Sequence, residues 1–280
     1  MIKLFQINER GINMTIIGID IGSSTVKIIE YKDEKILNKG IFESKEYEKI
    51  IDNFISENNI EQIDKIVVTG INAKKVDISK YNVPLEIVKE FDAVGTGGLY
   101  LSKKDKAIIA SIGTGTALIR AEGKEFKHLG GTGVGAGTLT NLCNKFVGIK
   151  TFDEILDLSK QGDLDNIDLR IKDLIDENIK TLPPELTLAN FGKLNENASR
   201  ADIVIGLINM VFEVIGMMTA FASINDDIKD IVLIGNIVSI PVVKDILKKI
   251  EKTHNVKFTI PEEPQFTVVI GAIASLMNNE

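Results

Sequence analysis

Residues 15–27 read TIIGIDIGSSTVK, and this stretch decides the fold. Residues 15–20 are mostly β-branched and apolar, which is typical of a buried strand, and they run into the small residues Gly22, Ser23 and Ser24. A second strand is predicted directly after them, at 25–31. A Rossmann motif would have a helix at this point, and the P-loop pattern GxxxxGK[ST] is absent from the sequence. The stretch therefore predicts two strands joined by a small-residue loop.

The second half of the chain starts in the same way. Residues 107–116 read AIIASIGTGT, again a buried strand that ends in small residues, and strands are predicted after it at 117–121 and 126–129. In the first half, strands at 25–31 and 36–42 follow the first strand. This shared order predicts a duplicated α/β fold, with one domain at 14–105 and a second at 106–280.

The remaining periodic segments fill in both halves. Helices are predicted at 44–58, 90–101, 136–146, 153–161, 242–251 and 268–277, and strands at 65–69, 85–88, 230–234 and 257–260. The last helix is a candidate to pack back on the first domain. Residues 185–195 read as irregular. Residues 201–223 form a long helix that is apolar almost all round, so it is either a core helix or a homodimer contact.

Composition excludes several classes of protein. The 280 residues carry a net charge of −7 without a basic cluster, which argues against nucleic acid and anionic membranes as partners. Cys143 is the only cysteine, so an internal disulfide or a zinc site of several thiolates is excluded, and a reducing cytoplasm is the expected location. No apolar run approaches the roughly 18 residues of a membrane span. Residues 1–13 are charged and mixed, and we interpret them as a leader or extension.

Four loops rich in small residues are candidates to hold phosphate. They lie at 20–25, 113–116, 130–137 and 235–236. Small residues let backbone N–H groups approach a phosphate, and a helix N-terminus adds about half a positive charge. The hydroxyl groups of Ser23, Ser24, Thr114 and Thr116 can add hydrogen bonds. Asp20 suits a hydrated Mg²⁺, which is held in proteins by one or two carboxylates together with waters and phosphate oxygens.

In combination these segments resemble the superfamily of acetate kinase, sugar kinases, Hsp70 and actin, and within it the type II pantothenate kinases. The resemblance rests on residues 18–27, 90–93, 112–116, 130–137, 186–192 and 234–235, which occur in the family's order between residues 14 and 276. It implies actin-like, ribonuclease H-like domains with ATP in the cleft between them. It also implies phosphorylation of the primary hydroxyl of pantothenate, the first step of coenzyme A synthesis.

The resemblance assigns Glu90 as the general base, which would accept the hydroxyl proton during phosphoryl transfer. A solvated acid at a helix N-terminus is the structural alternative for this residue. Lys27 resembles the family's lysine near the transferred phosphate, although a surface lysine on an edge strand fits equally well. The candidate nucleotide-binding residues are Gly22, Ser23, Ser24, Thr25, Lys27, Thr114, Gly115, Thr116, Ala136, Gly137, Thr138, Phe152, Gly235 and Asn236.

The candidate substrate-binding residues are His128 and Asn190. His128 stands where the family has an arginine that holds the substrate, and imidazole offers fewer donors than a guanidinium. Asn190 belongs to the segment 187–192, which the resemblance places near the pantothenate end. This difference from the family pattern affects the identity of the substrate more than it affects the predicted fold.

Four other functions can be weighed against the sequence. An ATPase activator of a radical dehydratase has a similar first loop, but it carries an iron–sulfur cluster between subunits, for which one cysteine per chain is too few. A repressor-type sugar kinase would show a zinc-binding cysteine cluster. A regulatory nucleotide-binding module without catalysis, or a kinase of another small hydroxyl compound, stays open because of His128.

Overall fold

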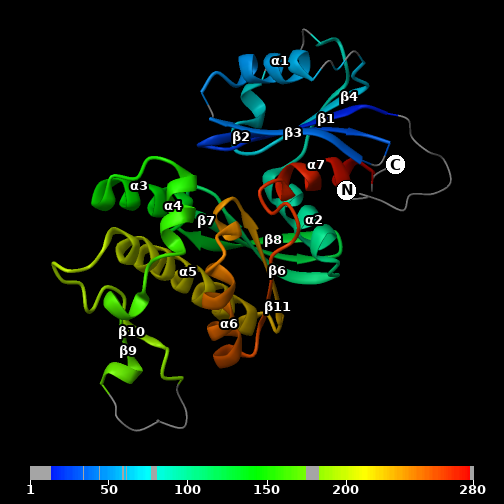
Figure 1. Ribbon diagram of the computed structural model, residues 1–280. Helices are drawn as coiled ribbons and strands as arrows, with labels where there is room; N and C mark the ends of the chain where they lie inside the picture. Colours follow the sequence, from blue (N-terminus) through cyan, green and yellow to red (C-terminus); the bar gives the residue numbers. More distant parts are fainter. Residues whose placement is uncertain are drawn as a thin grey trace.

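The computed structural model describes residues 14–277 except 34, 44, 59, 61, 77–80 and 175–182. Two five-stranded sheets lie one above the other, with helices α2 (Glu90–Ser102) and α7 (Thr267–Met277) between them (Figure 1). The interpretation of residues 1–13 as a leader lies outside the described residues.

The first sheet follows the meander predicted from the opening stretch. Its strand order is β3-β2-β1-β4-β5, in which β1, β2 and β3 are antiparallel neighbours and β4 and β5 run parallel to β1. Helix α1 (Tyr47–Glu57) follows the meander and packs on this sheet. The strands are β1 (Ile16–Ile21), β2 (Thr25–Lys32), β3 (Lys35–Glu43), β4 (Lys65–Thr69) and β5 (Leu85–Ile87).

The second sheet repeats the first strand for strand. Its order β12-β11-β6-β7-β8 has the same antiparallel meander followed by two parallel strands, so the predicted duplicated α/β fold is confirmed. Its strands are β6 (Lys106–Ile112), β7 (Thr116–Glu122), β8 (Glu125–Thr132), β11 (Asp230–Gly235) and β12 (Lys257–Thr259). Its helices are α3 (Ala136–Val147), α4 (Phe152–Ser159), α5 (Arg200–Asn225) and α6 (Val243–His254).

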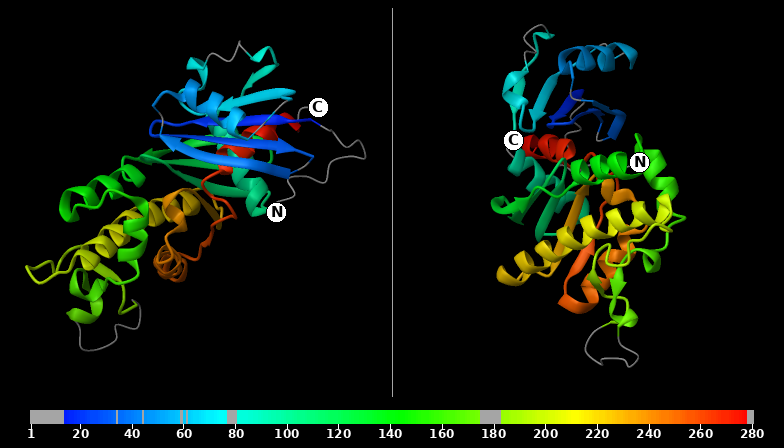
Figure 2. Two further views of the ribbon diagram at one scale, coloured as in Figure 1. Left: turned by 45° about the horizontal axis from the view of Figure 1, so that its top comes forward. Right: turned by 90° about the vertical axis from the view of Figure 1, so that its left-hand side faces the viewer.

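Alternation along the strands divides the core into layers. In β6, Ile108 and Ala110 face α5, whereas Ala107 and Ile109 share a cluster with α2 and α7. In β1, the odd-numbered isoleucines from Ile17 onward face α1, and the even-numbered positions face α7. Successive side chains point to opposite faces of a strand, so strands covered on both sides read as continuous apolar runs. The right-hand view of Figure 2 shows α1, α7 and α5 at successive levels.

Helices α2 and α7 touch through their backbones. A Cβ atom on Gly97 would lie 2.1 Å from the carbonyl oxygen of Thr267, and one on Gly271 would lie 2.0 Å from that of Ala93. Only glycine permits such an approach, because any side chain there would overlap the neighbouring backbone. The cluster around this contact contains apolar residues of both sheets, so the two halves share one core.

The structure differs from the sequence-based expectation in three places. Residues 130–132 belong to strand β8, so the glycine-rich loop is shorter than predicted. The segment read as irregular contains strand β10 (Thr187–Ala189), which pairs with β9 (Leu169–Arg170). Helix α1 starts at Tyr47, three residues later than predicted. The first two differences arise from strand pairing, of β8 with β7 and of β10 with β9, which outweighs local sequence preference.

Candidate active site

A cleft of about 530 Å³ lies at the carboxyl ends of parallel strands from both sheets. Such ends are where open α/β sheets bind ligands. The cleft brings together most of the predicted site residues from both halves of the chain. Those that line it are Asp20, Gly22, Ser23, Ser24, Thr25, Lys27, Glu90, Thr114, Gly115, Thr116, Ala136, Gly137, Phe152, Gly235 and Asn236.

The loop after β1 carries an ion pair into the cleft. The Nζ atom of Lys27 lies 3.0 Å from Oδ2 of Asp20, and both side chains are largely buried. Lys27 and Asp20 face each other across the β1–β2 ladder, and the turn between them is closed by the N–H of Gly22, which donates to the carbonyl of Thr25 at 3.0 Å. The hairpin therefore fixes a carboxylate and an ammonium group side by side at the floor of the cleft.

Hydroxyl groups join the loops of the two halves across the cleft. Oγ1 of Thr114 lies 2.7 Å from Oγ of Ser23 and 2.6 Å from Oγ of Ser24. These three side chains come from loops that follow the equivalent strands β1 and β6. A hydroxyl group can both donate and accept, so the same side chains can turn all their donors toward a phosphate.

The loop after β6 is packed against the start of α3. The N–H groups of Ala136 and Gly137 donate to the carbonyls of Gly113 and Thr114 at 2.8 and 3.0 Å. A Cβ atom on Gly135 would lie 2.7 Å from Gly115, so this junction requires glycine. Those two amide donors are therefore used within the protein, whereas the hydroxyl groups of the loop can turn toward the cleft.

Glu90 is the first residue of α2 and lines the cleft on the side of Asp20 and Lys27. Its carboxylate makes no hydrogen bond within the described part of the chain. Partial burial raises the pKa of Glu90 above its ordinary value, the negative charge of Asp20 raises it further, and Lys27 lowers it. A carboxylate of raised pKa that faces a cleft is suited to accept a proton.

Three predicted residues lie away from the cleft lining. His128 stacks on Phe91, the neighbour of Glu90, with ring centroids 4.5 Å apart and an interplanar angle of 8°. Thr138 uses its hydroxyl at the start of α3, where it donates to the carbonyl of Gly133 at 3.0 Å. Asn190 donates to Glu213 of α5 at 2.9 Å, beyond the β10 strand. His128 thus contacts the residue that follows the candidate base in sequence, whereas Asn190 contacts α5.

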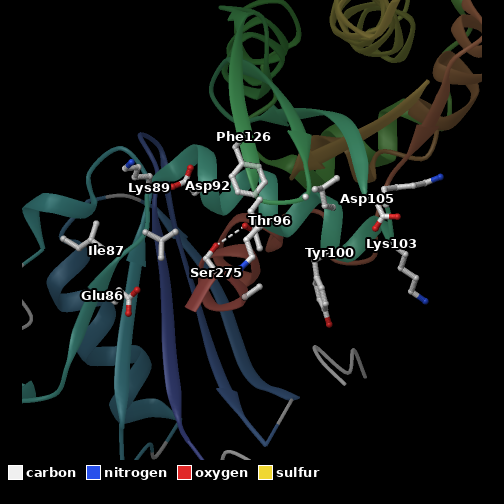
Figure 3. Close-up of a pocket in the computed structure, with 16 residues that line it drawn as sticks. Glu86, Ile87, Lys89, Asp92, Thr96, Tyr100, Lys103, Asp105, Phe126 and Ser275 are labelled. Atoms are coloured by element: carbon white, nitrogen blue, oxygen red, sulfur yellow. Dashed lines mark hydrogen bonds between the residues drawn. The ribbon is translucent and has the colours of Figure 1, made fainter. Parts of the chain in front are cut away.

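A larger cavity of about 920 Å³ contains none of the predicted site residues (Figure 3). It is lined by one face of α2, including Asp92, Thr96 and Tyr100, and by the turn after β7. Glu90 lies two residues before Asp92 and so points to the other face of the helix. The Oγ atom of Ser275 donates to Thr96 across α7 and α2 at 3.1 Å. The lining of the larger cavity includes none of the predicted small-residue loops, so we place the active site in the smaller cleft, where the loops after β1 and β6 meet.

The sequence analysis missed several residues that line the cleft. They are Ile71, Ser111, Ile112, Ala117, Thr132, Thr140, Ile234, Ile237, Pro264, Gln265 and Val268. Ile71 follows the predicted strand 65–69 and its closing Gly70, so its place at a strand end was a usable signal. The loop with Pro264 and Gln265 had no such signal. It is held at the cleft by a tertiary hydrogen bond, in which the N–H of Gly235 donates to the carbonyl of Pro264.

Comparison with known proteins identifies the family of this chain. A family model described as Fumble matches residues 106–250, which are 145 of the 280 residues. Type II pantothenate kinases from Staphylococcus aureus strains NCTC 8325 and USA300 are each 31% identical over 229 residues, covering 79% of this chain and 84% of the relative.

Solved structures share the fold. An activator of 2-hydroxyisocaproyl-CoA dehydratase from Clostridium difficile with bound ADPNP has a TM-score of 0.69 at 17% identity, over 95% of both chains. A ROK family glucokinase from Streptomyces griseus, in complex with glucose and AMPPNP, has a TM-score of 0.62 at 12% identity, over 95% of this chain and all of the other. At these identities the likeness concerns the fold alone. The family follows from the sequence relatives: this chain belongs to the type II pantothenate kinase family.

Proposed function

We propose that this protein transfers the γ-phosphoryl group of ATP to the primary hydroxyl of pantothenate, the first step of coenzyme A synthesis. The observation that carries the proposal is the position of Glu90. Its carboxylate lines the same cleft as the hydroxyl-bearing loops of both halves. Membership of the type II pantothenate kinase family supports pantothenate as the acceptor.

The nucleotide would lie between the two loops, with its phosphates toward Ser23, Ser24 and Thr114. The remaining candidate residues on the second half, among them Phe152 and Asn236, would then border the adenosine. The site also fits Mg²⁺ bound mainly by phosphate and water. Two carboxylates line the cleft, those of Asp20 and Glu90, and Asp20 is the one that suits a hydrated Mg²⁺. Among the described residues no group of three or more acidic, His or Cys side chains could hold a metal alone. Bound Mg²⁺ would neutralise phosphate charge.

In this arrangement Glu90 accepts the proton of the acceptor hydroxyl as the phosphoryl group is transferred. Lys27 balances negative charge near Asp20 and Glu90, and its ion pair with Asp20 holds it at the floor of the cleft. Closing the halves about α2 and α7 would exclude water, so that transfer to the acceptor is faster than hydrolysis.

The activator function is disfavoured by Cys143. This cysteine is fully buried in the core on α3, and burial raises the pKa of its thiol to about 11. A cluster ligand must be an accessible thiolate. A regulatory module without catalysis would bind ATP in the same cleft, and it is separated from a kinase by whether an acceptor stimulates ADP release.

We also propose that the protein is a cytoplasmic homodimer. Helix α5 is long and apolar enough to span a membrane, but two thirds of its apolar window is buried in the second half, as in a core helix. Near its end, Phe221 and Ile224 are 58% and 59% exposed. A second copy covering this end would remove their surface from water.

The first prediction concerns activity. The purified protein with Mg²⁺ and ATP should release ADP in response to pantothenate, and mass spectrometry should detect phosphopantothenate. Glu90→Gln should bind ATP normally and lose about 10²–10⁴-fold in turnover. If ADP release responds to pantetheine or a hexose but not to pantothenate, the proposed acceptor is wrong. If ATP is hydrolysed at the same rate without any acceptor, the regulatory module is favoured.

The second prediction concerns pH. The acid limb of the kcat/KM profile should lie above that of an ordinary glutamate, because Glu90 must be ionised and its pKa is raised. Asp20→Asn removes a charge that raises this pKa and should move the limb to lower pH, whereas Lys27→Met should move it to higher pH. Rates will fall in both variants, so only limb positions are compared. Lys49→Met, on α1, should leave the limb in place, and a common shift of all three variants would exclude Glu90 as the titrating base.

The third prediction concerns His128. Arginine at this position could keep the stack on Phe91 and donate two hydrogen bonds to the pantothenate carboxylate. Since a hydrogen bond to a charged group is worth about 1.5–3 kcal/mol, His128→Arg should lower the KM for pantothenate roughly 10-fold. Lys127→Arg, on the opposite face of β8, is the control. An unchanged KM in an active enzyme would mean that residue 128 does not contact the acceptor.

The fourth prediction concerns assembly. Light scattering at micromolar concentration should give the mass of two chains, and a Phe221→Glu, Ile224→Glu double variant should give the mass of one. Leu37→Glu changes a similarly exposed apolar residue on β3 and should stay dimeric. A monomeric parent, or a double variant that stays dimeric, would contradict an interface at the end of α5.

A further inference from the structure

Ile71 is the most exposed large apolar side chain among the residues the structure describes, with 71% of its surface accessible. It is also part of the cleft lining, together with Asp20, Lys27 and Glu90. An isoleucine left in water forgoes the stabilisation that burial of its side chain would provide. An apolar side chain that is exposed inside a functional cleft suggests that the ligand covers it.

The backbone on both sides of Ile71 is held against the turn after β1. Gly70 has a φ of +95°, and a Cβ atom there would lie 2.6 Å from the carbonyl of Ile21 and 2.8 Å from Oδ1 of Asp20, so only glycine fits. Asn72 donates from its N–H to the carbonyl of Ile21 at 3.2 Å and from its side chain to that of Gly22 at 3.3 Å. The position of Ile71 is therefore tied to the residues that carry Asp20.

This anchoring puts Ile71 in the half of the cleft that contains the candidate base. Asp20 is paired with Lys27, and both act on the charge of Glu90. The side chains that would border adenosine, including Phe152, Asn236 and Ile237, come from the second half of the chain. An apolar wall on the first half thus borders the acceptor and not the nucleotide.

We propose that Ile71 forms the apolar wall that binds the acceptor next to its reacting hydroxyl. Pantothenate has a matching group there, since the carbon beside its primary CH₂OH carries two methyl groups. Packing of Ile71 against these methyls would orient the hydroxyl toward Glu90 and disfavour acceptors that are polar at this position, such as sugars. This inference rests on the proposed function and names a specificity determinant for it.

The test is a cycle that removes each side of the contact in turn. One change is Ile71→Ala, and the other is a pantothenate analogue in which both methyl groups are replaced by hydrogen. Ile71→Ala should lower kcat/KM for pantothenate about 10-fold, because the variant lacks the isoleucine surface that the bound acceptor would partly cover. The KM for ATP should be unchanged. With the analogue, the same substitution should change kcat/KM less than about 2-fold, because contacting partners are not additive.

Ile87→Ala is the matched control. Ile87 lies on β5 of the same sheet, is 46% exposed and lines the larger cavity instead of the cleft, so its removal should change neither constant. Equal losses with pantothenate and the analogue, or a raised KM for ATP, would overturn the proposal. If the parent protein itself does not phosphorylate pantothenate, the proposed function fails first, and ADP release with other acceptors shows this separately.

Discussion

The backbone contact between α2 and α7 is the constraint on which the rest of the molecule depends. Gly97 and Gly271 let the two helices approach until their backbones touch, and apolar side chains from both sheets pack around them. A third glycine, Gly18 of β1, lies where a Cβ atom would be 2.8 Å from Ile273 of α7. The first sheet thus packs closely on α7, and through α7 it is joined to α2 and the second half.

That constraint also determines the site. Helix α2 begins at Glu90, just after strand β5, so the element that joins the halves carries the candidate base at its first residue. The loops that face it belong one to each half and meet through the hydroxyls of Ser23, Ser24 and Thr114. Without a ligand these hydroxyls donate to one another. A phosphate only accepts hydrogen bonds, so all three can donate to it, and binding exchanges weak neutral contacts for charge-assisted ones.

Much of the fold and of the candidate site was predictable from sequence, because these features depend on local sequence pattern. The strands at 15–20 and 107–112, their small-residue endings and the repeated meander predict the duplicated fold, and strand ends predict which loops meet. What could not be predicted depends on distant partners. Strand β10 has three residues and exists through pairing with β9, and the stack of His128 on Phe91 joins β8 to α2. The sequence places Ile71 at the end of a predicted strand, but its 71% exposure within the cleft is visible only in the structure.

Resemblance of fold and resemblance of function diverge in this protein. Its backbone superposes on a dehydratase activator with a TM-score of 0.69 and on a glucokinase with 0.62, although both are less than 20% identical to it. The names of these two proteins differ in the activity they state, so the shared fold does not by itself specify a function. Individual side chains do that here. The thiol of Cys143 is buried in the core, where burial keeps it protonated and away from any shared cluster. The role proposed for Glu90 requires a proton acceptor, which a carboxylate that lines the cleft can be.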